Sequence, residues 1–95
     1  MARFMCESYP IGIERNQLAA TVDNAREIAA EMRAAGVLVN LLSSTFVPAD
    51  DALFCVVEAP SDAEVISLGK RSGLQFAHVV EAFDVSTEAQ TSRRE

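Results

Sequence analysis

Apolar residues alternate with polar ones, or form short runs, in four segments of the chain. Such patterns are typical of β-strands, whose successive side chains point to opposite faces. The predicted strands cover residues 3–9, 37–47, 52–59 and 78–85. The turn at 48–51 is short, so the second and third strands are expected to form a hairpin, with a bulge near Ser43 and Ser44.

In two further segments apolar residues recur every three or four positions, as on one face of an amphipathic helix. The first helix is predicted over 16–35, ends at Gly36 and buries Leu18, Val22, Ala25, Ala29 and Met32. The second opens with a capping box, in which the Ser61 hydroxyl bonds the amide three residues on and Glu64 reaches back. It ends at Gly73, and its apolar face is expected to consist of Val65, Ile66 and Leu68.

The elements follow one another as strand, helix, strand, strand, helix, strand. This order predicts an α+β, ferredoxin-like sandwich, with a four-stranded antiparallel sheet and two helices on one face. Right-handed crossovers place the first and third strands in the centre of the sheet. We expect one domain over residues 1–86 and a disordered polar tail at 87–95, in which Ala89 is the one apolar residue.

Strand parity divides the apolar residues between the two faces of this sheet. The face under the helices is predicted to carry Phe4, Cys6, Val37, Val39, Leu41, Leu53, Cys55, Val57, Val80 and Ala82. The opposite, open face is predicted to carry Met5, Glu7, Tyr9, Leu38, Asn40, Leu42, Phe54, Val56, Glu58, Val79, Glu81 and Phe83. The apolar part of this second set is broader than a monomer usually leaves in water, so we expect a two-fold homodimer through the open face.

Three carboxylates, on Glu7, Glu58 and Glu81, are the unusual feature of the predicted open face. A half-buried carboxylate needs a partner, so the three are candidates to line a cavity that binds a cation or a polar ligand. The other candidate residues of this cavity are Tyr9, Asn40, Phe54 and Phe83. The alternative is that the carboxylates lie at strand ends or at the rim of the interface, in water or paired with Arg3 or Arg15.

The net charge, the cysteines and the single histidine limit which classes of function are expected. The net charge of −6 repels phosphate backbones and anionic lipid, so neither nucleic acid nor a membrane is an expected partner. Cys6 and Cys55 lie in apolar runs without C-x-x-C spacing, which is typical of core thiols in a reducing, cytoplasmic compartment. His78 is the single histidine, and nothing near it in the sequence suggests a dyad or triad. The sequence shows no catalytic constellation, which favours a binding or interaction module over an enzyme.

Several segments are shared with a known family: FCVVEAP at 54–60, SDAE at 61–64 and KRSGL at 70–74, together with Arg3, Glu7 and Val79. Over residues 2–88 the chain thereby resembles a small bacterial domain-of-unknown-function family, typified by a nickel-binding, ferredoxin-like protein that dimerises. The resemblance implies the same fold, a dimer and a divalent metal such as nickel, with Glu7, Cys55 and Glu58 at family positions. The chain departs from the family at Leu68, where the family has a histidine, and near Ser43 or Ser44, where a second histidine falls. Imidazole is the ligand type that suits nickel.

Three functions follow from these observations. The favoured one is a small cytoplasmic homodimer that binds a small-molecule ligand or a partner through its sheet. The first alternative is a nickel-binding protein in which Glu7, Cys55 and Glu58 replace the lost histidines. The second alternative rests on analogy with dimeric α+β barrels and is a cavity enzyme that uses Tyr9, Asn40 and Glu81.

Overall fold

The structure, a computed structural model, describes residues 1–10 and 12–85. Within these residues the chain forms, in order, β1 (Ala2–Ser8), α1 (Arg15–Ala34), β2 (Asn40–Val47), the single-turn helix η1 (Pro48–Asp50), β3 (Ala52–Ala59), α2 (Asp62–Ser72) and β4 (His78–Ala82). None of the helices described is long and apolar enough to cross a membrane. The predicted tail at 87–95 and the predicted domain end at residue 86 lie outside the described residues.

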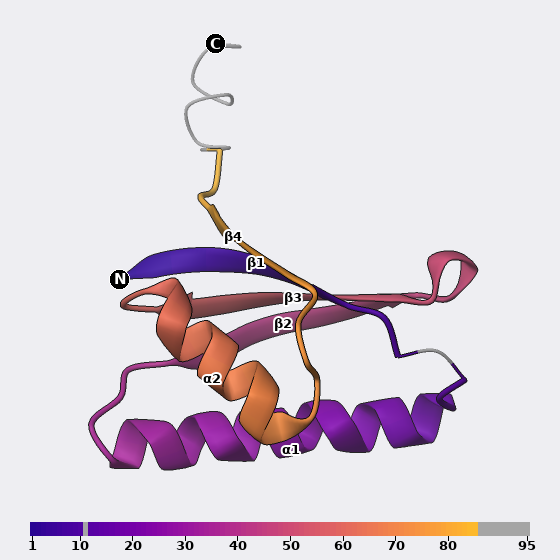
Figure 1. Cartoon of the computed structure of the whole chain (residues 1–95), viewed down its shortest axis with the longest axis horizontal. Helices are drawn as coiled ribbons and strands as arrows, with labels where there is room; N and C mark the ends of the chain where they lie inside the picture. Colours follow the sequence, from indigo (N-terminus) through magenta and orange to yellow (C-terminus); the bar gives the residue numbers. More distant parts are fainter. Residues whose placement is uncertain (11, 86–95) are drawn as a thin grey trace, which may run out of the picture.

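The strands form one antiparallel sheet in the order β2-β3-β1-β4. α1 and α2 lie on the same side of this sheet (Figure 1). The element order and the strand order together define the ferredoxin-like α+β fold, with β1 and β3 in the centre as predicted. The predicted bulge is present in β2, where the pairing with β3 shifts register between Leu41 and Ser43.

The hydrophobic core fills the space between the sheet and the two helices. α1 contributes the residues that its periodicity predicts, because Leu18, Ala25, Ala29 and Met32 are buried and Val22 packs against them. The central strands contribute every second residue, namely Phe4, Cys6, Leu53, Cys55 and Val57. The alternation of β1 and β3 was therefore assigned to the correct faces.

The start and the apolar face of α2 differ from the predictions. Ile66 is 42% exposed, because the buried positions Val65, Leu68, Gly69 and Ser72 follow a three-and-four spacing that leaves it on the outer side. The Ser61 hydroxyl donates to a carboxylate oxygen of Glu64 at 2.5 Å and not to the amide three residues on. This hydrogen bond is the main reason why the pKa of Glu64 is lowered.

The edge strand β4 has the opposite facing to the one predicted. Its register sets Val79 opposite Cys6, and residues directly opposite on neighbouring strands share a face. Val79 therefore packs against the core, whereas Val80 is 56% exposed on the open face. The predictions that Val80 faces the helices and Val79 the open face were wrong, because both residues are apolar and the alternation of this short strand fixes no parity.

The same shift moves the polar residues of β4. Glu81 lies opposite Phe4, and so on the helix side of the sheet edge, not on the open face as predicted. Ala82 lies opposite Arg3 and so on the open face, where the helix side was predicted. β4 ends at Ala82, earlier than the predicted residue 85, and Phe83 follows the strand with 85% of its surface exposed.

Candidate functional site

The open face of the sheet is covered by no other element within residues 1–10 and 12–85. Apolar side chains cross it in a line, because Met5 on β1 is paired with both Val56 on β3 and Val80 on β4. We call these three residues the apolar row. Met5 is 38% exposed and Val80 56%, although each lies in the middle of paired strands. Leu38 and Leu42 extend the exposed apolar surface towards β2.

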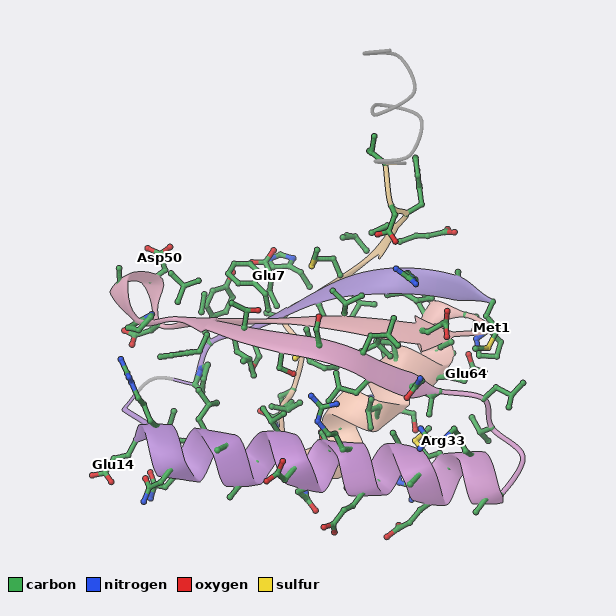
Figure 2. All side chains as sticks on the ribbon, turned by 180° about the vertical axis from the view of Figure 1, so that it is seen from behind. Met1, Glu7, Glu14, Arg33, Asp50 and Glu64 are labelled. Carbon is green, nitrogen blue, oxygen red and sulfur yellow. The ribbon has the colours of Figure 1, made fainter. Side chains whose placement is uncertain are left out.

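A polar group flanks the apolar row on one side, two residues further along β1. Glu7 on β1 lies opposite Phe54 on β3 and His78 on β4, and Figure 2 shows it on the side of the sheet away from α1. The Tyr9 hydroxyl donates to Oε1 of Glu7 at 2.5 Å. This hydrogen bond raises the pKa of Tyr9. The structure thus brings together three predicted cavity residues, Glu7, Tyr9 and Phe54, and adds His78.

A second polar group flanks the row on its other side. Glu58 on β3 lies opposite Asn40 on β2 and Arg3 on β1. Nε of Arg3 is 3.9 Å from Oε2 of Glu58, and Nη1 of Arg3 donates to Oδ2 of Asp84 at 2.5 Å. The pairing of Glu58 with Arg3 is the arrangement that the rim alternative predicts.

The three carboxylates that the sequence singled out do not converge. Glu7 pairs with Phe54, which is four positions from Glu58 along β3, a separation of roughly 13 Å. Glu81 and Phe83 line, together with Arg3 and Glu58, a separate cavity of about 310 Å³ near the start of β1. One cavity lined by all seven candidate residues is therefore not formed within a single subunit.

The residues proposed for a metal lie on both sides of the sheet. Cys55 is fully buried beneath the helices, whereas Glu7 and Glu58 belong to the open face. Within the described part of the chain, no group of three or more His, Cys, Asp or Glu side chains is placed to hold a metal ion. Leu68, at the family's histidine position, is fully buried in the core.

The two thiols are paired neighbours inside the core. Cys6 lies directly opposite Cys55, and both are free. Burial, with a smaller contribution from Cys55, raises the pKa of Cys6 to about 12. Burial also raises the pKa of Cys55, against the opposing effects of a contact with the Ser44 hydroxyl at 3.4 Å and the charge of Arg26. Neither thiol is therefore poised as a thiolate, which agrees with a structural role.

Two features of the surface were missed by sequence reasoning. The first is the approach of His78 to Glu7, which depends on the register of β4. The second is a cavity of about 520 Å³ on the helix side, between the first half of α1 and the β2–β3 hairpin. On α1, Arg15 and Arg26 flank the apolar residues that line this cavity. This pattern was the one signal for the cavity in the sequence.

Comparison with known proteins supports the fold. No protein-family model matches the chain, and no curated protein matches it. Among solved structures it is similar to the crystal structure of SCO4226 from Streptomyces coelicolor A3(2), with a TM-score of 0.75 and 21% sequence identity. The similarity covers 90% of this chain and 100% of that one. The family resemblance seen in the sequence stays a prediction.

Proposed function

We propose that this protein is a non-catalytic binding or interaction module that works as a two-fold homodimer joined through the open faces of its sheets. The proposal is carried by the apolar row, in which Met5 and Val80 are exposed and Val56 is half-buried, on a sheet face where a monomer usually presents polar side chains. Residues 86–95 contain one apolar side chain, that of Ala89, and so offer little to cover it. Burial of such a row stabilises an assembly by roughly 25 cal/mol per Å².

The dimer also gives the polar groups of the open face a role. A two-fold axis through the row encloses Glu7 and Tyr9 of each subunit at the border between the sheets. Their carboxylate and phenol oxygens offer hydrogen-bond acceptors to a small polar ligand held there, since the phenolic hydrogen of Tyr9 is already donated to Glu7. This arrangement explains why a half-buried carboxylate lies next to exposed apolar residues.

Size-exclusion chromatography with light scattering tests the dimer directly. We expect twice the 10.3 kDa mass of the chain for the unmodified protein. We expect the Met5→Glu variant to run as a folded monomer, because two carboxylates would meet at the axis. Ile66→Glu is the matched control, since it adds the same charge to an equally exposed position on α2. A 10.3 kDa species for the unmodified protein at high concentration would sink the proposal.

Calorimetric titration with Ni²⁺ separates this function from the metal-binding alternative that the resemblance implies. Micromolar binding that is lost in Glu58→Gln would favour the metal function. If the protein is a binding module, we expect the light-scattering mass to be the same with and without Ni²⁺. The proposed interface is apolar and needs no metal to form.

A further inference from the structure

A groove on the helix side of the sheet has the size and the lining of a small-molecule site. Its volume is about 520 Å³, within the range of 300–1,000 Å³ that ligand sites usually occupy. Its main walls are Leu18, Val22 and Arg26 on α1 and Ser44, Phe46 and Leu53 on the hairpin. This groove lies on the opposite side of the sheet from the proposed dimer interface, so the two sites do not compete.

Two α1 residues that line the groove, Ala19 and Val22, are less buried than the core positions that follow them on the helix. In the second half Ala25 and Ala29 are buried against the core, at 0% and 1% exposure. In the first half Leu18 is buried as well, whereas Ala19 is exposed and Val22 is only partly buried. Figures 1 and 2 show that the beginning of α1 and the turn of the β2–β3 hairpin lie at the same end of the molecule. At that end α1 and the hairpin border the groove, which is open to solvent.

The groove is apolar along most of its length and polar at one end. Phe46 lies opposite Leu53, and Ser44 lies opposite Cys55, so the lining changes from apolar to polar along the hairpin. Nη1 of Arg26 donates to the carbonyl oxygen of Leu41 at 3.1 Å. This bond ties the guanidinium to β2, the strand that also carries Ser44, and leaves most of its N–H groups for a ligand.

The charge of the groove is opposite to that of the molecule. It holds two cations, Arg15 and Arg26, and one carboxylate, Asp23, whereas the chain as a whole carries −6. None of these three side chains takes part in an ion pair among the described residues. The acidic surface of the rest of the molecule repels anions, whereas the excess of positive charge in this groove attracts one.

We propose that this groove binds a small amphipathic carboxylate, such as a medium-chain fatty acid or an aromatic acid of similar length. The carboxylate accepts hydrogen bonds from the Arg26 guanidinium, whose planar fork matches two carboxylate oxygens. The apolar body lies along Val22, Phe46 and Leu53 and extends towards Leu18. Arg26 and Arg15 are eleven residues apart on α1, about 16 Å along the helix axis, which leaves room for such a body between them.

Octanoate and 1-octanol are suitable probes, because they share an apolar chain and differ in the charged group. We expect octanoate to shift the backbone amide NMR signals of the groove residues and to bind about tenfold more tightly than octanol. In Arg26→Gln this preference should disappear. Arg33→Gln is the matched control: Arg33 also lies on α1 and donates to a strand carbonyl, that of Val39 at 2.8 Å, but it does not line the groove.

A second variant keeps the test decisive if Arg26→Gln fails to fold. Asp23 is exposed, so Asp23→Asn should leave the fold intact and strengthen octanoate binding by removing a like charge. Equal affinities of octanoate and octanol for the unmodified protein would overturn the proposal. Signal shifts confined to the open face of the sheet would also overturn it, and would leave the dimer proposal untouched.

Discussion

At the scale of single residues, the thiols show how burial decides what a side chain does. Cys6 and Cys55 lie side by side, which in an exposed site would suggest redox or metal chemistry. Burial instead keeps both protonated at neutral pH, since it raises both pKa values. They act as small apolar residues of the core between the sheet and the helices.

The raised pKa of Cys6 makes stability depend on alkaline pH. The thiol ionises near 9.0 in the unfolded chain and near 12 in the folded one. The contribution of the Cys6 thiol to the free energy of unfolding is therefore fully present below pH 9. It is lost as the pH rises towards 12, because the unfolded chain then releases the thiol proton and the folded chain does not. We expect the urea midpoint to fall between pH 7 and about pH 10, and to fall less in Cys6→Ala.

Val65→Ala is the control for this experiment. It also truncates a fully buried side chain, but it removes no titratable group. It should lower the midpoint at both pH values and leave the difference between them unchanged. If Cys6→Ala keeps the whole alkaline loss, the ionisation of Cys6 is not its cause.

At the scale of elements, β1 and β3 were predictable because burial on one face forces an alternation that the sequence records. The facing of β4 was not predictable, because either of its two consecutive valines could have been the residue that faces the core. β4 is also an edge strand, so β1 alone sets its register. The assignment of Glu81 to the open face failed for this reason. Parity predicted that Glu7 and Tyr9 share a face, but the hydrogen bond between them was not predicted.

The groove lay beyond prediction for a related reason. The periodicity of α1 shows which side of the helix faces inward, but not how far each half lies from the sheet. That distance depends on the length of the hairpin and on the register that sets Phe46 opposite Leu53. The sequence shows that Arg26 is a basic residue and Val22 an apolar residue on one helix. It does not show that either lies close to the β2–β3 hairpin.

The packing of α2 depends on one close approach. A Cβ placed on Gly69 would lie 2.7 Å from Cδ2 of Phe76, so the ring would have to move. Replacing glycine by alanine inside a helix normally stabilises by up to about 1 kcal/mol. Here we expect Gly69→Ala to destabilise by about 1 kcal/mol or more, because overpacking outweighs the gain in helix propensity. Urea unfolding measures the change.

A double variant isolates the cause. In a Phe76→Ala background the ring is absent, so Gly69→Ala should become neutral or stabilising. A stabilising Gly69→Ala in the unmodified protein would instead mean that Phe76 moves aside without cost into the neighbouring cavity lined by Ile66, Lys70 and Gln75.

At the scale of the whole molecule, the two proposed sites divide the work between the two sides of the sheet. In the proposed dimer the open face, with its apolar row, joins two copies, and the proposed groove on the helix side stays accessible in each. An assembly built in this way carries twice the charge of −6 of a single chain. Electrostatic repulsion between the two copies therefore disfavours the dimer, and the burial of apolar surface favours it.

This opposition predicts how salt affects the dimer. Raising the ionic strength from 0.1 to 1 M shortens the screening length from about 10 Å to about 3 Å, which weakens the repulsion and leaves apolar burial intact. We expect sedimentation equilibrium to show a tighter dimer at high salt. An interface held instead by ion pairs between subunits, with Arg3 of one copy reaching Glu58 of the other, would weaken under the same change. Arg3→Gln distinguishes the two: it should leave the salt dependence in place if the apolar row holds the dimer, and reduce it if ion pairs do.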